Sequence, residues 1–113
     1  MTKYLFLYRT PEDQSDYQPS PDEIQAMFAQ WNAWKAKFRT NVVDVGDGLK
    51  PGGRVWKNGA VSDGPFVEAK EVMGGYSIVQ AATYDEAAMV ARECPFTFTP
   101  GASIEIREMA GYE

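Results

Sequence analysis

The 113-residue sequence contains no histidine and only one cysteine, Cys94. Without histidine, the usual zinc and haem ligand sets cannot be assembled, and no imidazole is present to act as a general acid or base. A single cysteine cannot form an intramolecular disulfide. We therefore expect no metal and no cofactor. Cys94 comes at the end of a predicted helix rather than at its start, which indicates a packed side chain without activation.

Long hydrophobic runs and clusters of basic residues are also missing. The longest apolar run near the N-terminus, Tyr4 to Tyr8, is too short for a signal-peptide core or a membrane span. The eleven Lys and Arg residues are scattered along a chain of net charge -5, which argues against nucleic-acid binding. We therefore expect a cytoplasmic protein with neither nucleic acid nor membrane as a partner.

What the sequence does contain is typical of a globular protein, with 44% apolar and 13% aromatic residues. Its length fits one domain over residues 1–113. Alternating or aromatic-rich segments predict main strands at 3–9, 42–49, 74–82 and 102–109. Helices are predicted near 21–40 and 84–94, and Asn58-Gly59 predicts a small hairpin. Ser20 with Glu23, and Thr83 with Glu86, have the spacing of capping boxes.

This order of elements predicts an α+β, ferredoxin-like βαββαβ fold with an inserted hairpin, in which both helices cover one face of an antiparallel sheet. The first helix carries an apolar stripe that should face the sheet; it comprises Ile24, Met27, Phe28, Trp31, Trp34 or Lys35, and Phe38. The first strand is apolar on both faces, with Tyr4, Phe6 and Tyr8 on one side and Leu5 and Leu7 on the other. We therefore expect a homodimer packed through the uncovered sheet face. The pattern leaves open which of the two sets forms the interface.

Residues 62–95 and the later segment GASIEIREM resemble the DGPF family of the YCII-related superfamily. The N-terminal strand and the SPDE helix start are also similar to the family pattern, so the resemblance covers nearly the whole chain. Its specific elements are Asp63, Gly64, Pro65, Phe66, Glu68, Lys70, Glu71, Gly75, Tyr76, Asp85, Glu86, Ala87 and the IEIR of the last strand.

The resemblance implies a dimeric α/β barrel of ferredoxin-like subunits, in bacterial proteins of mostly undefined biochemistry. Wider relatives are thought to be enzymes with a His and Asp pair, and the absence of histidine here prevents a direct transfer of that mechanism. DGPF proteins often occur beside or fused to extracytoplasmic sigma factors, which supplies a regulatory alternative.

We predict a small-ligand site in a cleft between sheet and helices, with Asp63 as its polar anchor and, if there is catalysis, its base. Lys70 would orient Asp63 and keep it ionised, and Tyr76 would contact the ligand. Further ligand-binding candidates are Glu68, Glu71, Tyr8, Arg54 and Arg107. Each has a structural interpretation too: Asp63 in a turn, the loop charges in solvent, Tyr8 in the core, and the arginines in ordinary ion pairs.

Two functions therefore stay open at this point. One is a small-molecule binder or a cofactor-free enzyme. The other is a non-catalytic accessory or regulatory dimer that acts through its surface. A solvent-connected cleft with convergent polar groups would favour the first, and a large dry core the second.

Overall fold

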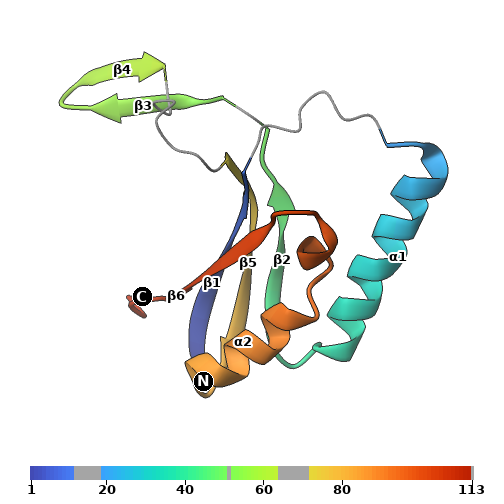
Figure 1. The fold of residues 1–113 in the computed structure, drawn as a ribbon. Helices are drawn as coiled ribbons and strands as arrows, with labels where there is room; N and C mark the ends of the chain where they lie inside the picture. Colours follow the sequence, from blue (N-terminus) through green and yellow to red (C-terminus); the bar gives the residue numbers. More distant parts are fainter. Residues whose placement is uncertain (12–18, 51, 64–71, 113) are drawn as a thin grey trace.

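The structure of the chain, a computed structural model, describes residues 1–11, 19–50, 52–63 and 72–112 (Figure 1). Its elements are β1 (Thr2–Thr10), α1 (Pro21–Lys37), β2 (Val42–Gly48), β3 (Arg54–Lys57), β4 (Ala60–Asp63), β5 (Val72–Ala81), α2 (Tyr84–Arg92), the 3₁₀ helix η1 (Pro95–Phe98) and β6 (Ser103–Glu108). Both helices therefore end two or three residues before the predicted limits. The sequence patterns did not predict η1.

The main sheet has the strand order β2-β5-β1-β6, and every neighbouring pair is antiparallel. With α1 between β1 and β2, and α2 between β5 and β6, this is the predicted ferredoxin-like α+β arrangement. The inserted β3-β4 hairpin forms a separate two-stranded sheet that projects beyond the end of the main sheet (Figure 1). Asn58 and Gly59 have φ values of 53° and 79°, as a tight two-residue hairpin turn requires.

The two faces of β1 have different surroundings. Tyr4, Phe6 and Tyr8 are buried together with residues of β5 and of both helices, so this face carries the hydrophobic core. Leu5 and Leu7 alternate with them and lie on the opposite face, where they are half-buried. We call the side of the sheet that carries Leu5 and Leu7 the open face.

The apolar stripe of α1 packs against the sheet over only part of its length, which corrects the prediction that all of it faces the sheet. Trp34 is buried, and Trp31 and Phe38 pack against the core, but Phe28 is 66% exposed. Ile24 and Met27 are exposed as well. The N-terminal part of α1 diverges from the sheet in Figure 1, and the residues of α1 that pack in the core, Trp31 and Trp34, are in its second half.

The predicted capping box of α1 is present: Glu23 N donates to Ser20 Oγ, and Ser20 N donates to Glu23 Oε1. In α2 only half of the predicted box forms. Glu86 N donates to Thr83 Oγ1, but the Glu86 carboxylate accepts from Ala82 N and from the Asn41 side chain instead. Glu86 therefore ties the start of α2 to the segment before β2.

Gly74 and Gly75 lie inside β5 rather than before it. Gly74 lies where the β1-β5 register shifts, between the pairs Tyr8–Gly75 and Arg9–Met73. A Cβ on Gly75 would come within 2.8 Å of the Asp47 carbonyl oxygen. The double glycine therefore permits the predicted close passage of the backbone beside a neighbouring strand. Neither helix of the described chain is both long and apolar enough to cross a membrane.

Candidate functional site

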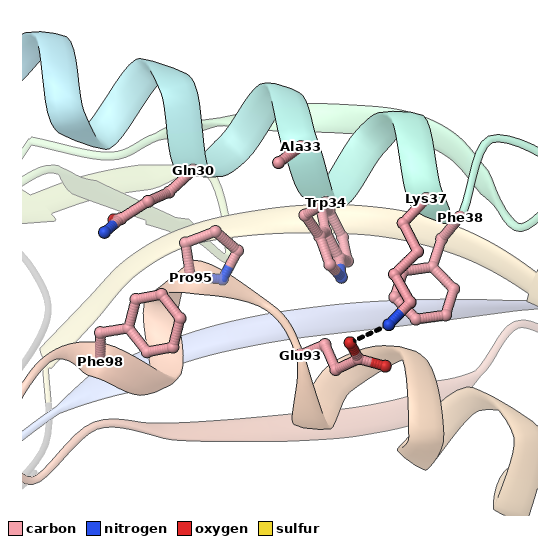
Figure 2. A pocket seen from close by; sticks show the side chains of 8 residues that line it. All are labelled: Gln30, Ala33, Trp34, Lys37, Phe38, Glu93, Pro95 and Phe98. Carbon is pink, nitrogen blue, oxygen red and sulfur yellow. Dashed lines mark hydrogen bonds and ion pairs between the residues drawn. The ribbon is translucent and has the colours of Figure 1, made fainter.

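A shallow groove of about 230 Å³ lies between α1 and η1 (Figure 2). One wall comes from α1 and Phe38 after it, and the other comes from η1 and Glu93 before it. The lining residues are Gln30, Ala33, Trp34, Lys37, Phe38, Glu93, Pro95 and Phe98. Most of this surface is aromatic or aliphatic, and the charged groups stand together at one end.

The floor of the groove is held in place by Trp34. Its indole is 3% exposed, and Nε1 donates a hydrogen bond of 3.0 Å to the Val90 carbonyl oxygen in α2. Trp31 packs edge-on against Trp34, with ring centroids 5.6 Å apart. Trp34 is therefore a buried support beneath the groove, and the accessible apolar surface comes from Phe38 and Phe98.

An ion pair between Lys37 and Glu93 closes one end of the groove (Figure 2). The side chains are 61% and 46% exposed, and such exposed pairs stabilise a fold by well under about 1 kcal/mol. Lys37 can therefore exchange Glu93 for another anionic partner at little cost. At the other end, the Phe98 ring is 64% exposed.

A chain of buried hydrogen bonds lies in the core, in contact with η1. Tyr8 Oη donates to Ser77 Oγ at 2.5 Å, and Ser77 Oγ donates to the Val45 carbonyl oxygen at 2.6 Å. The Cys94 thiol contacts Tyr8 Oη at 3.5 Å. Phe96 of η1 stacks on the Tyr8 ring, with centroids 4.7 Å apart.

Burial raises the pKa of the Tyr8 phenol and that of the Cys94 thiol. Both groups therefore stay protonated at neutral pH, and neither is a ready nucleophile or base. This agrees with the interpretation of Cys94 as a packed side chain, since it is fully buried. The hydrogen-bond chain positions β1, β5 and β2 relative to one another.

The open face of the sheet is a second distinctive surface. Leu5 and Leu7 of β1 lie beside their cross-strand partners Ile78 and Tyr76 of β5, and all four side chains are half-buried. On the β6 side of this apolar strip, Glu105 forms ion pairs with Arg9 at 2.7 Å and with Arg107 at 3.2 Å. Arg107 lies two residues after Glu105 on β6, whereas Arg9 belongs to β1, where its register partner is Ser103.

The structure disperses the described members of the predicted site. Tyr8 is in the core, Tyr76 and Arg107 belong to the open face, and Arg54 is in the β3-β4 hairpin. Arg54 donates to the Gly53 carbonyl oxygen. Tyr8 and Tyr76 cannot contact one ligand, because they lie on opposite faces of the sheet.

Asp63 is the last residue of β4, where its backbone pairs with Arg54. The side chain of Asp63 and all of Glu68, Lys70 and Glu71 lie outside the described residues. The site that we predicted from these residues therefore stays a prediction.

The groove could not be predicted from the sequence, because its walls are far apart in the chain. Two signals were nevertheless present. Pro95, Phe96 and Phe98 place two aromatic rings in a short connection that follows a helix. Gln30, Ala33 and Lys37 recur beside Trp34 at helical spacing, which marks a second contact face of α1 next to the apolar stripe.

Comparison with protein families gives a match over nearly the whole chain. The family model described as "YCII-related domain" matches residues 3–110, which is nearly the whole chain. No curated protein matches the sequence.

Proposed function

The chain belongs to the YCII-related domain family, and because this description names a domain and no activity, we propose a function from the groove itself: the binding of a small molecule. The observation that carries the proposal is the groove between α1 and η1, with a fixed indole floor and a charged pair at one end. Its volume of about 230 Å³ lies just below the range of about 300–1,000 Å³ for typical ligand pockets. The ligand is correspondingly small.

The lining indicates the chemistry of this ligand. Phe38 and Phe98 offer accessible aromatic surfaces above the buried Trp34 and Pro95, which suit an aromatic or planar aliphatic group. Lys37 offers a cation whose existing partner, Glu93, is weakly held. We therefore expect a small aromatic molecule with one carboxylate, bound with its ring on the groove floor and its carboxylate at Lys37.

The experiment uses benzoate and phenylacetate as probes, with benzylamine as the oppositely charged control. Saturation-transfer NMR should show ring contacts for both carboxylates and weaker contacts for the amine. Phe98→Ala and Lys37→Met should each weaken carboxylate binding by about 3- to 10-fold, because each removes one exposed contact. Met89→Ala is the matched control, since Met89 is also exposed but does not line the groove. Equal binding of the amine, or an equal loss of carboxylate binding in Met89→Ala, would contradict ligand binding in the groove.

The site centred on Asp63, with Lys70 and Tyr76, is a separate proposal. Catalysis without a cofactor, with Asp63 as base, belongs to that site alone. Asp63→Asn and Lys70→Met distinguish the two sites, because neither substitution should change probe binding if the groove is the binding site. Loss of binding with unchanged thermal stability would favour the Asp63 site instead.

We also propose that the protein is a homodimer in which the open faces of the two copies pack together. The support for this is that four half-buried apolar side chains lie together on the open face of one copy. Light scattering at micromolar concentration should give the mass of two chains, and a well-folded monomer would contradict this. If native mass spectrometry of the purified dimer finds no bound small molecule and the probes do not bind, the alternative of an accessory or regulatory dimer is favoured.

A further inference from the structure

The groove between α1 and η1 has a polar group at each of its ends. Among the described residues that line it, the charged and amide side chains are Lys37, Glu93 and Gln30. Lys37 and Glu93 form the ion pair at one end. Figure 2 shows Gln30 at the opposite end, on the side of Phe98. A ligand that fills the groove therefore meets a cation at one end and an amide at the other.

The amide of Gln30 is available to a bound molecule. Gln30 is exposed, and within the described parts of the chain its side chain makes no hydrogen bond. The side chain extends from α1 on the side of Pro95 and Phe98 (Figure 2). A primary amide has two donor hydrogens and one acceptor oxygen, so it can either donate to a hydroxyl group or accept from one.

The spacing of the two ends limits which ligands reach both of them. Lys37 and Gln30 are seven residues apart on α1, which places them on the same side of the helix and about 10 Å apart along its axis. The ring of the proposed ligand lies between them, above Trp34 and Pro95. With a hydrogen bond of about 2.8 Å at each end, para-hydroxyphenylacetate spans about 12 Å, which is close to this separation. An ortho hydroxyl group stays near the carboxylate and cannot reach Gln30.

We propose that Gln30 determines the specificity of the groove by hydrogen bonding to a polar substituent para to the carboxylate arm of the ligand. The preferred ligand class is then the para-hydroxyaryl carboxylates. This inference rests on the proposed binding of aryl carboxylates and adds the group that selects among them. Because Gln30 is exposed, water competes for its amide, and the para hydroxyl group should strengthen binding by about 3- to 10-fold.

The test compares three probes of similar size: para-hydroxyphenylacetate, para-methylphenylacetate and ortho-hydroxyphenylacetate. NMR titration of the whole chain should give a Kd for the first probe about 3- to 10-fold below that of the other two. Gln30→Met preserves side-chain length and helix propensity but removes the amide, so the three values should fall within about twofold of one another. Gln25→Met is the matched control and should keep the preference, because Gln25 is also exposed on α1 but does not line the groove.

The outcomes separate the role of Gln30 from the groove itself. If para-methylphenylacetate binds and Lys37→Met weakens its binding, but the para hydroxyl group adds nothing, the role of Gln30 is overturned and the groove remains the binding site. The same conclusion follows if the preference persists in Gln30→Met, or if that variant weakens all three probes equally. If no aryl carboxylate binds the unsubstituted chain, both the inference and the proposed function are overturned.

Discussion

Ser77→Ala should destabilise the protein more than Tyr8→Phe, although each removes one hydroxyl group from the same buried hydrogen bond. In Ser77→Ala, the Tyr8 hydroxyl loses its acceptor while it stays in the core, where Tyr8 is 3% exposed. The Val45 carbonyl oxygen also loses the 2.6 Å hydrogen bond from Ser77. Leaving a buried donor without a partner costs about 1–3 kcal/mol.

In Tyr8→Phe, by contrast, the donor itself is removed. Ser77 keeps its hydrogen bond to Val45, and the aromatic ring keeps its stacking on Phe96. The cost should be about 0.5–1.5 kcal/mol, the usual net contribution of one hydrogen bond. The double variant contains no orphaned phenol, so its destabilisation should be smaller than the sum of the two single effects by about 1 kcal/mol.

Urea denaturation followed by circular dichroism measures all four free energies of unfolding, provided that the slope with urea is the same in each variant. Ser62→Ala is the matched control, because the Ser62 hydroxyl is in the exposed hairpin and makes only a long 3.5 Å contact with the Val55 carbonyl oxygen. It should change stability by less than about 0.5 kcal/mol. Additive effects of Tyr8→Phe and Ser77→Ala would refute the argument from the orphaned donor.

Two further predictions concern pH and a glycine. Burial raises the pKa values of Cys94 and Tyr8, so the folded state binds these protons more tightly than the unfolded state. The free energy of unfolding should therefore be constant up to about pH 8 and fall above it. The fall should be about 1.4 kcal/mol per pH unit for each group that ionises only on unfolding. Urea midpoints between pH 7 and 11 test this. Tyr8→Phe should reduce the component that begins near pH 10, to which Tyr4 also contributes because burial raises its pKa. An unchanged profile would count against the argument. Gly46→Ala should lower the free energy of unfolding by more than about 3 kcal/mol, because the new Cβ would lie 1.8 Å from the Tyr76 carbonyl oxygen. Gly59 has open space around it, so Gly59→Ala should cost only about 1–2 kcal/mol, for the positive φ alone. Equal melting temperatures for the two alanine variants would show that the close approach of β2 and β5 is not as described.

The fold was predictable from the sequence where the signals are local. Ser20 and Glu23 fix the start of α1 through two reciprocal hydrogen bonds, and Asn58 and Gly59 fix the hairpin turn through backbone conformation. Glu86 shows the limit of such signals. Its spacing from Thr83 predicts a capping box, but its carboxylate also lies within reach of Ala82 N and Asn41, and the sequence does not reveal Asn41 as a neighbour.

The groove and the extent of α1 packing were not predictable for a related reason. The spacing of Ile24, Met27 and Phe28 shows which side of the helix is apolar, but not the angle at which the helix crosses the sheet. Likewise, the groove is lined by Trp34 of α1 and Pro95 of η1, two residues that only the tertiary fold brings to one place. The predicted site around Asp63 depends on side chains outside the described residues, so the structure leaves that prediction as it was.

The central position of β1 has a consequence for the order of events in folding. Tyr4 pairs with Val79 on one side and with Glu108 on the other, so the first strand to leave the ribosome must wait for the last strand before its pairing is complete. Folds dominated by such long-range pairings form slowly. Meanwhile the segment from Tyr4 to Tyr8, uncharged and β-prone on both sides, is exposed to other nascent chains. We expect its capture by a chaperone, or its aggregation at high expression, to set the yield of folded protein.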